Sequence, residues 1–149
     1  MTGSCQVDFY VLDESALTAE QLACRLALMA WEQGHRIAVL TETTEHANKL
    51  DELMWNYPAG RFLPHTAKAG DARGPVSIGT PDMPLPGDRE VIINLTSTAI
   101  AEPGSYKRLL EIVPGNPSQR SVSRLKFRAY RDQGLDPASH PIGKRNGPK

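Results

Sequence analysis

The sequence has few cysteines and no long hydrophobic run. Only two of its 149 residues are cysteines, Cys5 and Cys24, and their spacing matches neither a redox Cys-x-x-Cys motif nor a zinc knuckle. We interpret them as buried free thiols in a reducing compartment. No segment approaches the run of about 18 apolar residues that crosses a bilayer, and residues 1–6 lack the features of a secretory signal. These absences predict a cytoplasmic protein without a membrane anchor.

Motifs for catalysis and for phosphate or metal binding are also missing. There is no Gly-x-x-x-x-Gly-Lys phosphate loop, no Gly-x-Gly-x-x-Gly turn, no Gly-x-Ser-x-Gly elbow and no His-Glu-x-x-His pair. The acidic Asp13 and Glu14 follow the first apolar run, where they would repel a phosphate. Four histidines lie in separate segments without metal-ligand spacing: His35, His46, His65 and His140. We therefore predict a protein that is not an enzyme and that uses no metal or cofactor.

Charge is balanced overall but unevenly distributed. Seventeen Lys and Arg residues match 17 Asp and Glu residues, so the formal net charge is zero. A general nucleic-acid binder would be strongly basic, and the balance excludes that class. Residues 1–58 carry nine acids and three bases, a charge of −6, whereas residues 59–149 carry eight acids and 14 bases, a charge of +6. Such asymmetry concerns partners and orientation rather than fold.

Strand and helix patterns alternate along the chain. Apolar runs rich in β-formers predict strands at 7–12, 36–41 and 91–95, and one or two short strands in the proline-rich stretch 59–89. This alternation with helices is typical of a parallel sheet covered by helices.

Apolar stripes at helical spacing predict helices from Thr18 to about Gly34 and from Thr44 to about Tyr57. A short helix near 105–110 and a brief strand at 111–113 are expected to follow. The chain is long enough for one domain, which we place at 1–135. The Pro-, Gly- and base-rich tail at 136–149 has little to bury, and we expect it to be loose.

The last predicted helix, from Asn116 to about Gln133, is unusually basic, with five bases and no acid over residues 117–131. On a wheel of about 100° per residue, one face holds Val122, Leu125 and Ala129, and we predict that this face docks on the sheet. Lys126 falls to the side. The opposite face carries four arginines and one aromatic residue: Arg120, Arg124, Phe127, Arg128 and Arg131.

The arginine face predicts an anionic ligand. Like charges four residues apart repel each other, and nothing within the helix compensates them. Phe127 among the arginines indicates an apolar pocket rimmed by positive charge, which suits an acidic peptide with an aromatic, carboxylate-bearing end. Two alternatives remain: a solvated basic face paired with the acidic half of the chain, and direct contact with single-stranded nucleic acid.

Two large apolar residues near the end of the second helix form another candidate site. Trp55 lies one step off the predicted apolar stripe, and Phe62 lies in a proline-punctuated loop. They are either ordinary core residues or, if exposed together, a protein-binding patch.

Several segments together resemble the chi subunit family of bacterial DNA polymerase III. They are FYVLDE near the start, AEQLACRLALMAWEQGHRIAVLTE, ANKLDELMWNYPAGRFLPH, VIINL and RLKFRAYRDQG, and the resemblance spans nearly all of residues 6–135. It implies a non-catalytic accessory subunit with a Rossmann-like, three-layer α/β/α fold. Residues 66–88 and the tail beyond 136 depart from the family pattern.

The resemblance also implies partners for both candidate sites. The acidic C-terminal tail of single-stranded DNA-binding protein is expected on Arg120, Arg124 and Phe127, with Arg128 and Arg131 alongside. The psi subunit, which ties chi to the clamp loader, is expected on Trp55 and Phe62, where a helicase competes in some bacteria. DNA is then contacted only indirectly.

Overall fold

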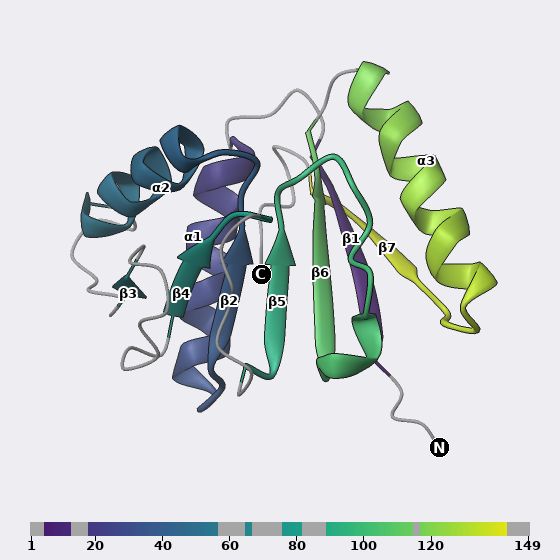
Figure 1. Ribbon diagram of the computed structural model, residues 1–149, viewed down its shortest axis with the longest axis horizontal. Helices are drawn as coiled ribbons and strands as arrows, with labels where there is room; N and C mark the ends of the chain where they lie inside the picture. Colours follow the sequence, from purple (N-terminus) through teal and green to yellow (C-terminus); the bar gives the residue numbers. More distant parts are fainter. Residues whose placement is uncertain are drawn as a thin grey trace.

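Seven strands form one sheet in which every pairing is parallel (Figure 1). The computed structural model describes residues 5–12, 18–56, 65–66, 76–81, 89–114 and 117–142. The strands are β1 (Gln6–Leu12), β2 (Ile37–Leu40), β3 (His65–Thr66), β4 (Val76–Gly79), β5 (Val91–Asn94), β6 (Arg108–Val113) and β7 (Ala138–Ile142). Their order across the sheet is β3-β4-β2-β5-β6-β1-β7.

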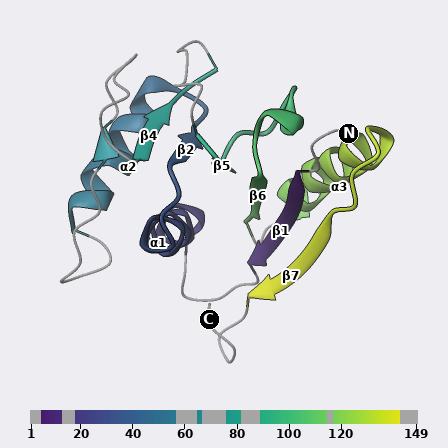
Figure 2. The same ribbon diagram turned by 90° about the horizontal axis from the view of Figure 1, so that it is seen from below.

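Three helices cover the two faces of this sheet. They are α1 (Ala19–Glu32), α2 (Thr44–Asn56) and α3 (Pro117–Asp132), and a single 3-10 turn, η1 (Pro103–Ser105), lies between β5 and β6. The view in Figure 2 shows α1 and α3 on opposite sides of the sheet. The predicted α/β/α architecture with a parallel sheet is confirmed.

Two apolar clusters, one on each face, join the layers. One cluster contains side chains of α1 and α2, such as Leu22 and Leu50, together with Ile37 and Val39 of β2. The other lies beneath α3 and contains Phe9 and Tyr130. Successive residues of a strand point to opposite faces, and a parallel sheet buried on both sides therefore needs the near-continuous apolar runs seen in the sequence.

The ends of α1 follow the signals in the sequence. Thr18 caps the helix by accepting a hydrogen bond from the Gln21 backbone, and the Gln21 side chain accepts one from the Thr18 backbone, at 3.1 Å each. Gly34 closes the helix with φ of 90°, a left-handed conformation that glycine adopts at little cost.

The predicted helix near 105–110 is wrong. Only Pro103–Ser105 form a 3-10 turn, and Arg108–Val113 form one strand, β6, between β5 and β1. The short run Arg-Leu-Leu-Glu fits a helix or a buried strand equally well by pattern. Residues 108–113 form a strand because they pair with β5 on one side and with β1 on the other.

The expectation of a loose tail is wrong for Ala138–Ile142, because this segment is the edge strand β7 and pairs with β1. A polar cluster holds it: buried Asp8 accepts hydrogen bonds from Arg108 at 2.7 Å and pairs with His140 at 2.8 Å. The His140 ring also stacks on Tyr10, with ring centroids 5.2 Å apart. Residues 143–149 lie outside the described residues.

We predict that Asp8→Asn destabilises the fold at neutral pH by about 2 kcal/mol, because it removes a carboxylate from buried, charge-assisted hydrogen bonds. Burial favours the neutral carboxyl, but the Arg108 and His140 hydrogen bonds outweigh it and lower the pKa of Asp8 below its usual value. Asp8 therefore stabilises the fold above its ordinary pKa, and this contribution is lost as the pH falls through the lowered pKa.

Urea unfolding at a series of pH values measures this effect, with exposed Asp136→Asn as the control. The gap between wild type and Asp8→Asn should be widest at neutral pH and should close in acid. A gap that stays constant with pH would contradict the assignment.

Candidate functional site on helix α3

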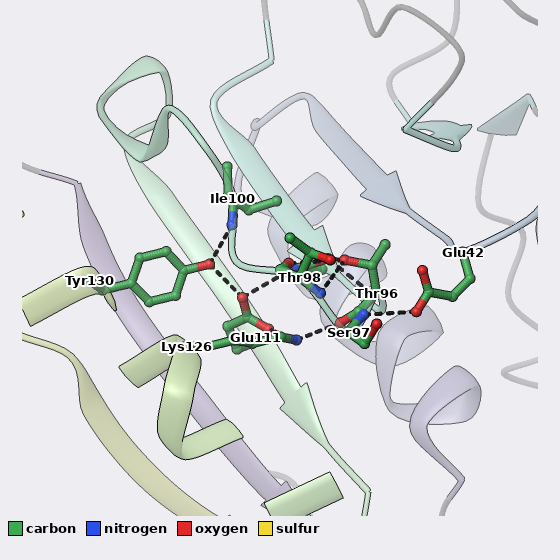
Figure 3. A network of polar contacts seen from close by, with 9 residues as sticks. Glu42, Thr96, Ser97, Thr98, Ile100, Glu111, Lys126 and Tyr130 are labelled. Carbon is green, nitrogen blue, oxygen red and sulfur yellow. Dashed lines mark hydrogen bonds and ion pairs between the residues drawn. The ribbon is translucent and has the colours of Figure 1, made fainter. Parts of the chain in front are cut away.

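A buried polar network fastens α3 to the sheet (Figure 3). At its centre is Glu111 of β6, whose side chain is 1% exposed. The Lys126 ammonium lies 2.8 Å from one carboxylate oxygen, and the Tyr130 hydroxyl and the Asn94 amide donate to the other. Two elements of the sheet and two successive turns of α3 thus meet at a single carboxylate.

The same network orders the loop after β5. The Thr96 carbonyl accepts a hydrogen bond from Lys126, and the Ile100 backbone donates to the Tyr130 hydroxyl at 2.8 Å. Asn94 accepts hydrogen bonds from the backbone and hydroxyl of Thr96, at 3.0 and 2.7 Å. The Ser97 backbone donates to Glu42, which extends the contacts to the segment that enters α2 (Figure 3).

Burial dominates the electrostatics of this network. It raises the pKa of the Glu111 carboxyl, and the Lys126 charge with the three hydrogen bonds to Glu111 offsets part of that rise. Burial and the neighbouring Glu111 raise the pKa of the Tyr130 phenol, so this hydroxyl stays a donor. Removing one partner of such a buried pair costs about 3–5 kcal/mol.

The predicted docking face of α3 is wrong. Leu125 is 66% exposed, and Val122 and Ala129 are only half-buried, whereas Lys126 and Tyr130 are buried. Relative to the prediction the helix is turned by about a quarter of a revolution. Apolar periodicity failed here because a lysine occupies the centre of the buried face, where Glu111 compensates its charge.

All four arginines of the predicted site lie exposed on one flank of α3, namely Arg120, Arg124, Arg128 and Arg131. An open hollow on this flank is lined by Arg124, Phe127, Arg128, Arg131 and Asp132. The structure therefore brings four of the five candidate residues together, whereas Arg120 does not line the hollow. The acidic Asp132 on the rim was not anticipated.

Phe127 belongs partly to the core. Its ring is half-buried and packs against Phe9 of β1, with centroids 5.3 Å apart. Its remaining surface lines the hollow between the arginines. Because the ring packs on Phe9, the hollow has an apolar wall anchored in the core beside exposed charged side chains.

The second candidate site is only partly described. Trp55 lies in the last turn of α2 and is 56% exposed, which favours the interpretation as a surface residue over that as a core residue. Phe62 lies outside the described residues, as does Tyr57. In Figure 1, α2, whose last turn carries Trp55, and α3 stand at opposite ends of the sheet.

The described residues contain neither a metal-binding cluster nor a membrane-spanning helix. Within the described ranges, no three His, Cys, Asp or Glu side chains gather as a metal site requires. None of the described helices combines the length and apolar character of a bilayer-spanning helix. Both cysteines are buried and free.

Comparison with known proteins identifies the family. The family model described as DNA polymerase III chi subunit, HolC, matches residues 5–138. The chain belongs to this family. It is 35% identical over 138 residues to the DNA polymerase III subunit chi of Pseudomonas aeruginosa, covering 92% of this chain and 96% of that protein. The chi subunit of Escherichia coli (strain K12) is 30% identical over 135 residues, with coverage of 86% and 92%. Membership supports an accessory role in DNA replication.

Solved structures of other proteins share the fold of this chi family member. T4 UvsW superposes with a TM-score of 0.67 at 7% sequence identity, over 96% of this chain and 42% of that one. The C-terminal domain of the DEAD-box protein Dbp5 gives a TM-score of 0.59 at 12% identity, over 94% and 91%. At such low identity, these matches show the α/β fold alone.

We predict that Tyr130→Phe lowers the free energy of unfolding by about 1–2 kcal/mol, because it keeps the ring but removes the acceptor of the Ile100 amide and one of the three donors to Glu111. Tyr106→Phe is the matched control, a half-buried tyrosine outside the network. Chemical denaturation measures both variants, and equal small losses would argue against the network.

Proposed function

We propose that this chi family member is a non-catalytic, cytoplasmic accessory subunit of the DNA polymerase III holoenzyme. It links the acidic C-terminal tail of single-stranded DNA-binding protein to the clamp loader through the psi subunit. One observation carries the first half of this proposal: α3 exposes four arginines on one flank, and three of them, Arg124, Arg128 and Arg131, line a hollow with an aromatic wall. Family membership supports the second half.

The spacing of the arginines suits an extended peptide. Arg120 and Arg131 are 11 positions apart, which is about 16 Å along a helix at 1.5 Å per residue. An extended peptide covers that distance with about five residues. Several acids within a short tail can therefore each meet a guanidinium, which pairs with a carboxylate through two hydrogen bonds.

The hollow suits the end of such a tail. Phe127 offers an apolar surface to a terminal aromatic side chain, while Arg124 and Arg128 stand beside it to receive a free carboxylate. Exposed ion pairs contribute little individually. We therefore expect a dissociation constant in the micromolar range, about −7 to −8 kcal/mol, that weakens as salt rises.

We predict that Arg124→Ala abolishes most binding of an acidic peptide that ends in phenylalanine with a free carboxylate, and that it leaves the fold intact. Isothermal titration calorimetry measures the affinity, and circular dichroism checks the fold. Lys107→Ala is the matched control, since it removes an exposed positive charge that does not belong to α3 or to the lining of the hollow. Unchanged calorimetry for Arg124→Ala would refute the site.

The four exposed arginines of α3 could instead contact single-stranded nucleic acid directly. Fluorescence anisotropy with a labelled oligonucleotide and no second protein separates the two functions. Tight binding with a steep salt dependence would support the nucleic-acid module and count against the adaptor.

For the second partner we propose the surface around Trp55 and Phe62. A tryptophan that is 56% exposed at a helix end is costly to leave in water and is a frequent interface anchor. Its distance from α3 lets both partners bind at once (Figure 1). The adaptor role needs such independence.

We predict that Trp55→Ala loses the psi subunit in a pull-down from lysate but binds the acidic peptide as wild type does. Met29→Ala, at another large exposed apolar side chain, is the control and should retain psi. Loss of both partners by Trp55→Ala would indicate a folding defect, and retention of psi would refute the assignment.

A further inference from the structure

Helix α3 has two faces that could be buried, and the sheet receives the more polar one. The buried face centres on Lys126 and Tyr130. The face about a quarter turn away holds Val122, Leu125 and Ala129, yet Leu125 is left 66% exposed. Hydrophobic burial alone does not explain this choice, because an apolar stripe is the usual contact face of a helix.

The buried charges explain it. Glu111 lies in the middle of β6 beneath α3, with its side chain 1% exposed. Any rotation that removes Lys126 leaves this carboxylate buried without a counter-charge, which is far more costly than one exposed leucine. Hydrogen bonds are also directional, so Lys126 and Tyr130 together allow one rotation of the helix.

That rotation determines where the arginines lie. In the observed orientation Phe127 packs on Phe9, and Arg124 and Arg128 border the hollow. A quarter turn toward Leu125 would carry Phe127 off the core and into solvent. The hollow would then lose its wall, although every arginine would remain exposed.

We propose that the buried Lys126–Glu111 ion pair selects which face of α3 docks on the sheet and so positions the exposed arginines of α3 for their acidic ligand. Lys126 and Glu111 are positioning residues that do not touch the ligand. The effect on binding rests on the proposed function, whereas the orientation itself can be tested without any ligand.

A thiol at position 125 reports the orientation. Leu125→Cys places a reactive group on the exposed face, and its rate of alkylation by iodoacetamide follows its exposure. The two native cysteines contribute little background, because both are buried and burial raises the pKa of Cys5 to about 11 and of Cys24 to about 12.

Three variants are compared. The first carries Leu125→Cys alone, the second adds Glu111→Leu, and the third adds both Glu111→Leu and Lys126→Met. In the Glu111→Leu background, Lys126 has no counter-charge and must reach solvent, so the face with Val122, position 125 and Ala129 docks on the sheet. We expect the labelling of position 125 to slow about tenfold and the affinity for the acidic peptide to fall about tenfold. With Lys126→Met added, both quantities should return to near their starting values.

The labelling rate distinguishes positioning from simple destabilisation. If α3 merely detached from the sheet, position 125 would be labelled as fast as in Leu125→Cys alone, or faster. That result overturns the proposal even if peptide binding is lost. The proposal is also overturned if adding Lys126→Met does not bring the slowed labelling back to the faster rate of Leu125→Cys alone. If Glu111→Leu does not fold, Glu111→Gln replaces it, because it keeps the side-chain shape and removes only the charge. Labelling of position 125 that is as fast in Glu111→Gln as in Leu125→Cys alone would also overturn the proposal.

Leu125→Cys alone separates the proposed function from the proposed role of the ion pair. If this variant fails to bind the acidic peptide, the proposed function fails, and the labelling rates still decide whether the ion pair orients α3.

Discussion

The need to compensate one buried carboxylate shapes much of this structure. Glu111 lies in the interior of a parallel sheet, where an unpaired charge would be prohibitive. Its partners come from β5 and from two turns of α3. The contacts that satisfy it fasten α3 to the sheet and order the loop after β5. A fully satisfied network of this kind gives a unique orientation more readily than apolar packing does.

The two sides of the molecule differ in how their surfaces are fixed. On one side α1 and α2 rest on a conventional apolar cluster, and Trp55 projects at the end of α2. On the other side α3 is held by polar contacts together with Phe127 and Tyr130 against Phe9. Directional contacts lie under the helix that exposes four arginines, whereas Trp55 lies on a helix that rests on apolar packing.

Much of the fold could be predicted from the sequence, because parallel strands buried on both faces are apolar throughout and their helices carry clear caps. The arginine flank was also predictable, since charge at helical spacing is a local property. The rotation of α3 was not, because it depends on Glu111, which lies 15 residues from Lys126 in another element and whose burial beneath α3 no local pattern shows. Strand β7 was missed because its polar residues are held by Asp8, 132 residues away from His140.

The place of β1 in the sheet has a consequence for biosynthesis. Among the described strands, β1 is synthesised before all others, yet its two neighbours, β6 and β7, are synthesised after the rest, and Arg108 follows Asp8 by 100 residues. An apolar strand thus waits unpaired through most of translation, when exposed edges are most prone to aggregate. The strands β2, β4 and β5, by contrast, can pair as soon as they emerge. The half of the domain that carries Trp55 can therefore assemble on the nascent chain before the arginine-bearing half exists.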